Sequence, residues 1–117
     1  AIYAACRMLE ILQENDWPLS ELLSDLPCTF ATPEIRVECP DEIKFDLVKK
    51  AVQQFKKSYK VIDLDGARIE FEDGWGLVRA SNTQPVLVMR FEAATEKRLR
   101  EIRKLVESTI VALRKKI

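Results

Sequence analysis

The chain has 117 residues, 47% of them hydrophobic, with 19 basic and 19 acidic side chains and no histidine. This length suits one domain with a modest core, and the zero net charge argues against a general nucleic-acid-binding protein. The apolar runs are far shorter than the ~20 residues of a membrane span. Without histidine, the chain lacks the commonest general base and metal ligand.

The first 30 residues are predicted to form a helix and a connector. Residues 1–14 place apolar side chains on one helical face, at Ile2, Ala5, Cys6, Leu9 and Leu12. Leu19–Leu23 is expected to add one or two helical turns, and Pro33 favours extended backbone at Thr32. Because a helical pattern runs from residue 1 with no initiator Met and no visible signal peptide, we expect a fragment with a domain boundary near residue 30.

The three cysteines, Cys6, Cys28 and Cys39, are widely spaced, and no pair fits a C-x-x-C pattern. A zinc site or a disulfide framework is therefore unsupported. Free cysteine is among the most buried residue types, so we expect buried or partly buried thiols. Free thiols also favour a reducing, cytoplasmic compartment.

A strand and a helix open the main domain. Residues 34–39 alternate apolar and polar side chains, which predicts a half-buried strand. Asp41 is expected to cap the helix that follows, whose buried stripe is Leu47, Val48, Ala51, Val52 and Phe55. The other side is expected to face solvent, with phosphate binding as a less favoured role, and it carries Lys49, Lys50, Lys56 and Lys57.

Four further strands are predicted, at residues 60–64, 67–72, 75–79 and 85–91. The first three are separated by Asp65-Gly66 and Asp73-Gly74. Asp-Gly between alternating segments is the strongest short-range hairpin signal, because both central residues of such a turn need positive φ. An antiparallel meander is therefore expected.

The chain ends in an amphipathic helix. Thr95 is expected to cap it, and its apolar stripe is Leu99, Ile102, Val106, Ile110 and Leu113. From residue 34 onward the predicted order is β-α-β-β-β-β-α, which indicates an α+β domain, an antiparallel sheet with two helices on one face. The other face of the sheet is then free for solvent, a ligand or another domain.

The segment between the last two strands, R-A-S-N-T-Q at residues 79–84, collects hydrogen-bond donors and contains no acid. Arg79 offers a planar fork that matches two oxygens of a phosphate or carboxylate, and Ser81 and Thr83 add hydroxyls. Asn82 adds an amide and tolerates positive φ, a conformation that turns backbone N–H groups toward one concavity. Arg90, on the next strand, is a candidate second guanidinium. Such a donor set suits a phosphoryl group.

Other interpretations stay open on residue types alone. Ser, Asn and Thr are common turn residues whose side chains bond to local backbone, and an arginine at a strand end commonly pairs with a nearby acid. Asp63 and Asp65 form a weak metal candidate, because Asp65 is needed by its turn.

The sequence around this loop resembles a known family. D-G-W-G-L-V-R-A-S-N-T-x-P-V-L-V-x-R-F-E-A, residues 73–93, is similar to the C-terminal domain of the bacterial phosphomannomutase/phosphoglucomutase enzymes of the α-D-phosphohexomutase superfamily. T-P-E-I-R-V (32–37), D-E-x-K-F (41–45) and I-Y-A-A-C-R-M-L-E-I-L (2–12) extend the resemblance over nearly the whole chain. Phosphoglucosamine mutases typically carry S-G-T and an acid in place of residues 81–84, which favours the mannose/glucose branch.

The resemblance implies a TATA-box-binding-protein-like β-α-β(4)-α domain at residues 31–117, preceded at residues 1–30 by the last helix of another domain and a linker. The family's full enzyme has four domains and interconverts hexose 1-phosphate and 6-phosphate through a bisphosphorylated sugar, with Mg²⁺ and glucose 1,6-bisphosphate. Implied partners are mannose or glucose phosphate and the other three domains, in a cytoplasmic monomer. By position, the clamp for the phosphate that is not reacting would be Arg79, Ser81, Asn82 and Thr83, assisted by Arg90.

The chain lacks the family's phosphoserine, metal and sugar loops. On its own it is therefore expected to bind sugar phosphate weakly, to hold no metal and to catalyse nothing. Two competing hypotheses are a standalone nucleic-acid-binding module that uses the open sheet face, and a structural interaction module in which Arg79 is dispensable. The neutral charge and the few aromatic residues on the strands argue against nucleic acid.

Overall fold

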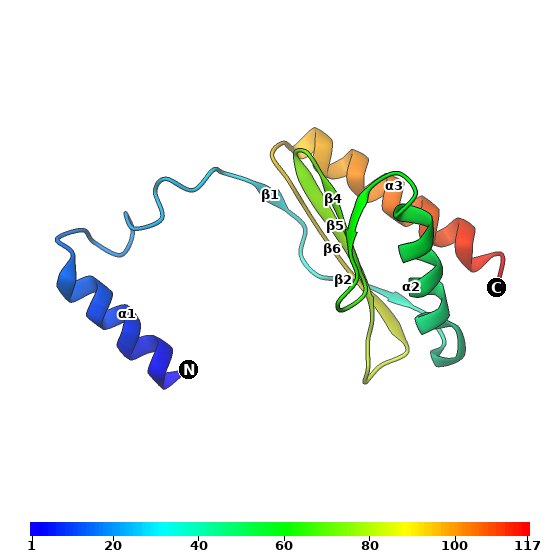
Figure 1. Ribbon diagram of the computed structural model, residues 1–117, viewed down its shortest axis with the longest axis horizontal. Coiled ribbons are helices and arrows are strands. Elements are labelled where there is room, and N and C mark those ends of the chain that lie inside the picture. Colours follow the sequence, from blue (N-terminus) through cyan, green and yellow to red (C-terminus); the bar gives the residue numbers. More distant parts are fainter.

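The computed structural model describes all 117 residues, which form an extended arm and a two-layer α+β body (Figure 1). The arm consists of α1 (Ile2–Glu14) and the segment that leads to β1 (Phe30–Ala31). No residue of α1 is buried, and α1 contacts no other element. The radius of gyration is 17.9 Å, against about 13 Å for a compact chain of this length. The arm accounts for the difference.

The arm contains the predicted helix α1 and differs from the prediction at Leu19–Leu23. The apolar face of α1 exists but has no partner, so Ile2 and Leu9 are exposed. Leu19–Leu23 forms consecutive turns rather than a helix, with bonds such as that from the Glu21 N–H to the Pro18 carbonyl at 2.9 Å. Short helical turns need tertiary contacts to be stable, and every residue of this segment except Leu22 is exposed.

The body contains one antiparallel sheet, as predicted. Its strands are β1, β2 (Ile35–Glu38), β3 (Lys60–Ile62), β4 (Ala67–Phe71), β5 (Gly74–Ala80) and β6 (Val86–Ala93). The order is β1-β6-β5-β4-β3, and β2 also pairs with β6. β1 meets the end of β6 and β2 meets its beginning, so the two short strands share one edge on either side of Pro33.

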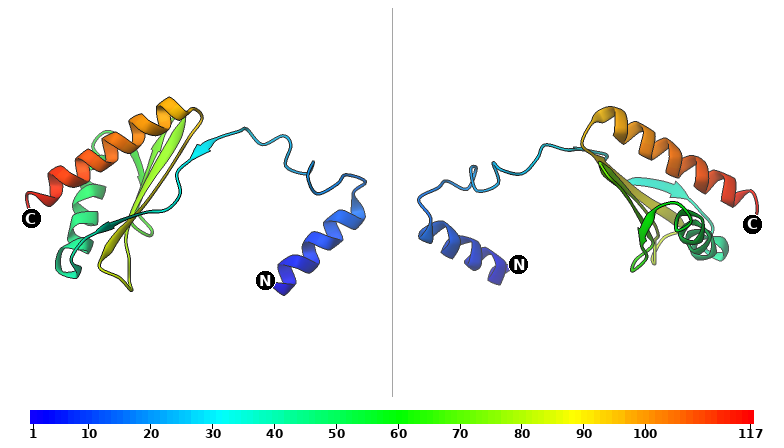
Figure 2. Two further views of the ribbon diagram at one scale, coloured as in Figure 1. Left: turned by 180° about the vertical axis from the view of Figure 1, so that it is seen from behind. Right: turned by 45° about the horizontal axis from the view of Figure 1, so that its top comes forward.

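Helices α2 (Asp41–Phe55) and α3 (Glu96–Arg114) contact each other and cover one face of the sheet (Figure 2). The predicted stripes face the sheet: Leu47, Ala51 and Phe55 on α2 and Ile102, Val106 and Ile110 on α3 are buried. The sheet contributes Ile69, Val78, Leu87 and Phe91 to this core. The α+β architecture predicted from the sequence is therefore confirmed.

The two predicted helix caps had different outcomes. Thr95 caps α3, and its hydroxyl oxygen accepts a hydrogen bond from the Arg98 N–H at 3.2 Å. The prediction for Asp41 was wrong, because Pro40 occupies the cap position and Asp41 is the first helical residue. The Asp41 carboxylate instead pairs with the Lys44 ammonium at 2.5 Å.

Neither Asp-Gly sequence forms the turn that was predicted. Gly66 has φ of 96°, but no residue other than glycine has a positive φ, and the β3–β4 connection spans residues 63–66. The central residues of the β4–β5 turn are Glu72 and Asp73, and Gly74 already belongs to β5. A Cβ at Gly74 would lie 2.4 Å from the Glu92 carbonyl oxygen, so close backbone packing explains this glycine.

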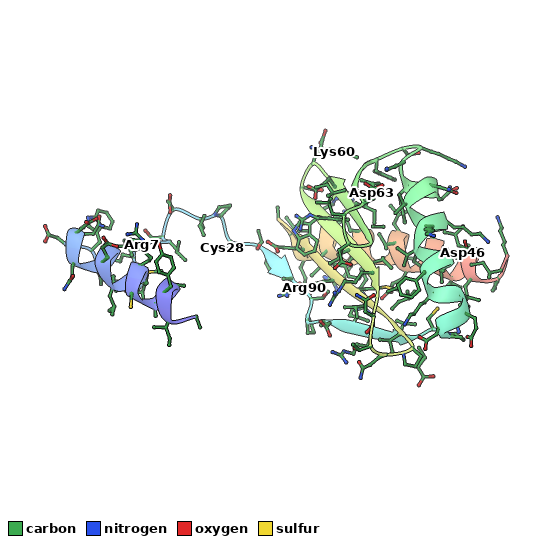
Figure 3. All side chains as sticks on the ribbon, turned by 60° about the horizontal axis from the view of Figure 1, so that its bottom comes forward. Arg7, Cys28, Asp46, Lys60, Asp63 and Arg90 are labelled. Carbon is green, nitrogen blue, oxygen red and sulfur yellow. The ribbon has the colours of Figure 1, made fainter.

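The cysteines are all free, but only Cys39 is buried. Burial raises the pKa of its thiol, against smaller lowering effects of Arg114 and Lys44. The prediction of burial was wrong for Cys6 and Cys28, which are both exposed. Figure 3 shows Cys28 on the segment that leads to the sheet. None of the three helices combines the length and the apolar composition needed to cross a membrane.

Candidate functional site

Arg79 and Arg90 lie on the face of the sheet that the helices leave open. Alternation along β5 turns Val78 into the core and Arg79 away from it. Arg79 pairs with Val88, and Leu77 pairs with Arg90. The two arginines are therefore diagonal neighbours on one face, within reach of a shared ligand. Figure 3 shows Arg90 on the side of the sheet away from α2.

Val88 is an apolar residue beside Arg79 and Arg90 on the open face of the sheet. It lies on the open face and outside the core cluster, yet it is only 6% exposed. Its cross-strand neighbours are Arg79 on β5 and Arg36 on β2. Arginine stems cover apolar surface while the guanidinium stays in water, which accounts for the burial of Val88.

The loop between β5 and β6, residues 81–85, is organised by Ser81. The Ser81 hydroxyl oxygen accepts hydrogen bonds from the N–H groups of Thr83 at 3.4 Å and Gln84 at 3.2 Å. Asn82 and Thr83 are exposed, and neither side chain has a hydrogen-bond partner within the chain. Asn82 tolerates positive φ but does not adopt it here, and these local bonds close the loop without a left-handed residue.

Gln84 anchors the loop to the body from two sides. The Lys44 ammonium, on α2, donates to the Gln84 carbonyl oxygen at 3.0 Å and is almost fully buried. The Arg36 guanidinium, on β2, donates to the Gln84 side-chain oxygen at 2.7 Å. Both anchors were missed in the sequence. A signal existed for Lys44: it lies three residues before Leu47, on the same face of α2 as the buried stripe, and a lysine at such a position is normally paired.

An acid from another loop lies against Arg79. The Asp65 carboxylate, on the β3–β4 connection, is 3.3 Å from the Arg79 guanidinium. Pairing of the strand-end arginine with a nearby acid, one of the alternatives left open by the sequence, therefore occurs. Arg90 has no ion pair. The candidate site therefore combines the paired guanidinium of Arg79, the unpaired guanidinium of Arg90 and the exposed side chains of Asn82 and Thr83.

A cavity of about 440 Å³ lies between α2, the β3–β4 connection and the start of the loop. Its polar lining includes Lys49, Lys56, Asp63, Asp65 and Asn82. The Lys56 ammonium pairs with Asp63 at 2.7 Å, and this hydrogen bond lowers the pKa of the Asp63 carboxyl. Lys49 and Lys56, expected to face solvent with phosphate binding as a less favoured role, thus border the region of the loop.

The residues present do not fit a magnesium ion. No group of three or more His, Cys, Asp or Glu side chains is placed to hold a metal. Asp63 and Asp65, the pair considered from the sequence, each face a different cation, Lys56 and Arg79. We therefore assign no metal-dependent step to this chain.

Comparison with known proteins places this geometry in a family. Residues 34–108 match the family model described as phosphoglucomutase/phosphomannomutase, C-terminal domain. A phosphoglucomutase of Neisseria meningitidis serogroup B is 41% identical over 114 residues, which cover 93% of this chain and 24% of that protein. A phosphomannomutase/phosphoglucomutase of Pseudomonas aeruginosa is 40% identical over 114 residues, which cover 96% of this chain and 24% of that protein.

Two further relatives broaden the comparison. A probable phosphoglucosamine mutase of Methanopyrus kandleri is 42% identical over 103 residues, covering 86% of this chain and 22% of that protein. A crystal structure of a phosphoglucomutase/phosphomannomutase family protein from Burkholderia thailandensis matches with a TM-score of 0.78 and 36% identity, over 96% of this chain and 23% of that one. The chain spans about a quarter of the length of these relatives. The chain belongs to the phosphoglucomutase/phosphomannomutase C-terminal domain family.

Proposed function

We propose that residues 31–117 bind the phosphate that is not reacting in a phosphohexomutase, an enzyme that interconverts hexose 1-phosphate and 6-phosphate. Residues 1–30 would then be the last helix of the preceding domain and a linker. The exposed apolar face of α1 supports this division, because such a face normally packs against protein. The enzyme names of the relatives support the reaction.

The observation that carries the proposal is the anchored loop beside two arginines. Lys44 and Arg36 fix Gln84, and Ser81 closes the loop, while the side chains of Asn82 and Thr83 remain unpartnered. Fixing a loop before a ligand arrives lowers the entropy cost of binding. Guanidinium, hydroxyl and amide donors are the groups that bind phosphoryl oxygens.

This chemistry suits a mutase that must bind a bisphosphorylated sugar in two orientations. The donors contact phosphate rather than a particular sugar face, so either end of the intermediate is accepted. The parent enzyme is expected to use Mg²⁺ and glucose 1,6-bisphosphate. Since no residues here fit Mg²⁺, the chain alone would bind sugar phosphate and leave the chemistry to the other three domains.

An open-faced nucleic-acid module is less well supported. Trp75, the aromatic side chain on the open face, is covered on one side by the Arg68 guanidinium, 4.1 Å from the ring centre. Arg68 also pairs with Glu70 at 2.6 Å. Stacking of single-stranded bases needs free aromatic faces, and this ring offers at most one.

The test is an amide NMR titration of the chain with glucose 1-phosphate and, separately, with inorganic phosphate. We expect both ligands to shift the resonances of residues 79–84 and to saturate in the millimolar range, equivalent to roughly −4 kcal/mol. Arg79→Ala should weaken binding at least tenfold, because a charged hydrogen bond contributes about 1.5–3 kcal/mol.

Arg103→Ala is the matched control, because it also removes one positive charge but lies on the exposed side of α3, paired with Glu107. It should leave the affinity within about twofold. Equal affinities of wild type and Arg79→Ala would refute the proposed site and favour a purely structural module. Equal losses in Arg79→Ala and Arg103→Ala would indicate a general charge effect without a specific site.

A further inference from the structure

Asp65 faces the guanidinium on which phosphate binding is proposed to depend. Its carboxylate oxygen lies 3.3 Å from Arg79 Nη1, and the Asp65 side chain is 72% exposed. The other carboxylate of the same connection, Asp63, is engaged by Lys56 at 2.7 Å. Asp65 is therefore the acid that competes for Arg79.

Gly66 allows the β3–β4 connection to pack closely against Arg79, because it has no side chain. It has φ of 96°, and a Cβ at this position would lie 2.7 Å from the Arg79 Cβ and 2.4 Å from the Val78 carbonyl oxygen. The connection therefore packs directly on the backbone of β5. Because Gly66 follows Asp65, this packing keeps the carboxylate next to the guanidinium.

We infer that Asp65 is an internal competitor of the phosphate, a carboxylate that occupies Arg79 until a phosphoryl group displaces it. The inference rests on the proposed function. The guanidinium fork matches two oxygens of either a carboxylate or a phosphate, so the same donors serve both anions. Two anions at one guanidinium repel each other, and an exposed ion pair is weak. A phosphate with close to two negative charges therefore displaces Asp65 at a cost in affinity.

Another cation borders the same cavity as the Asp65 carboxylate. Asp65 and Lys49 both line the cavity between α2 and the β3–β4 connection, and Lys49 forms no ion pair. Phosphate binding at Arg79 would thus be linked to a move of the Asp65 side chain toward Lys49. Asp65 acts through Arg79 and does not itself contact the ligand.

The experiment compares Asp65→Asn with Asp63→Asn by titrating each with inorganic phosphate at low ionic strength. Both variants remove one negative charge from the same connection without changing side-chain size. Asp65→Asn should bind phosphate about two- to tenfold more tightly than wild type, and Asp63→Asn should stay within about twofold. A gain in affinity is informative, because damage to the fold would weaken binding instead.

The outcomes separate this inference from the proposed function. If wild type binds phosphate and Arg79→Ala does not, but Asp65→Asn behaves like Asp63→Asn or binds more weakly, the competitor role is refuted and the phosphate site stands. If neither wild type nor Asp65→Asn shifts the resonances of residues 79–84, both the site and the competitor role are refuted. Tighter binding by Asp65→Asn alone confirms the competition.

Discussion

The two faces of the sheet use alternate residues of the same strands and differ in almost every property. The helix-covered face carries Val78 and Phe91, which are fully buried. The open face carries their sequence neighbours Arg79 and Arg90, of which only Arg79 has an ionic partner, Asp65. Because side chains alternate along a strand, one short stretch of sequence contributes both to the stability of the fold and to the candidate site. The two roles should therefore be separable by mutation.

The sharpest test of this separation uses two adjacent residues on β6. Phe91→Ala removes a fully buried ring from the core, and the free energy of unfolding should fall by about 3–5 kcal/mol. Arg90→Ala removes an exposed side chain and should change it by less than about 0.5 kcal/mol. Urea unfolding at neutral pH measures both. Similar losses in the two variants would show that the open face also contributes to stability.

Lys44 is expected to be an exception to this separation. It is buried on the side of the sheet that the helices cover, yet it donates a hydrogen bond to Gln84 in the loop of the candidate site. Lys44→Met keeps the apolar stem but removes the ammonium that donates to the Gln84 carbonyl oxygen. The unfolding free energy should change by only about 1 kcal/mol, since removal of a buried charge offsets the lost bonds. Phosphate affinity should fall about threefold or more, because the loop loses an anchor and a positive charge.

Lys50→Met is the control for this prediction. Lys50 also lies on α2 and pairs with an acid, Asp46, at 3.1 Å, but it donates no bond to the loop. Its phosphate affinity should match that of wild type in the same NMR titration. A loss of affinity in Lys50→Met as large as that in Lys44→Met would assign the effect to net charge on α2 rather than to the anchor.

The smallest expected effect is a dependence of stability on pH at the sheet end remote from the loop. Arg98 Nε donates to the Asp73 carboxylate at 2.7 Å, which lowers the pKa of Asp73 below its usual value of 3.8. The stabilising contribution of this pair is therefore complete above that value and is lost as the pH falls through the folded-state pKa. Urea unfolding should show Asp73→Asn less stable than wild type at pH 7, with a smaller difference at pH 3.

Asp46→Asn supplies the comparison for the pH series. Asp46 pairs with Lys50 within α2 and is exposed (Figure 3), so its replacement should change stability little at either pH. If the difference in unfolding free energy between Asp73→Asn and wild type stayed constant from pH 7 to pH 3, the pair of Asp73 with Arg98 would not be the source of the pH dependence.

Most of the body could be predicted from local sequence patterns. The stripes of α2 and α3 are signals of burial that depend on neighbouring residues only. The cap at Thr95 is equally local and was confirmed. The arm shows the limit of this reasoning, because periodicity indicates an apolar face on α1 but not what covers it.

The candidate site was predicted only in part. The residue types of the segment from Arg79 to Gln84 indicated anion binding. The side chains that bind Gln84 and the acid that pairs with Arg79 come from distant segments. Arg36 and Gln84 are separated by 48 residues, Lys44 and Gln84 by 40, and Asp65 and Arg79 by 14. Strand register and the packing of α2 bring these groups together, and neither can be seen in a local window of sequence.

The sequence by itself determined the order of strands and helices from residue 34 onward, the buried faces of α2 and α3 and the donor-rich loop, because each follows from the spacing or chemistry of nearby residues. The tertiary structure decided the turn geometry, since neither Asp-Gly pair forms the two central residues of a two-residue turn, and both glycines lie where a Cβ would clash with neighbouring backbone. It also decided that Lys44 is buried and that Asp65 pairs with Arg79. These depend on three-dimensional proximity, which the packing of the sheet and helices creates.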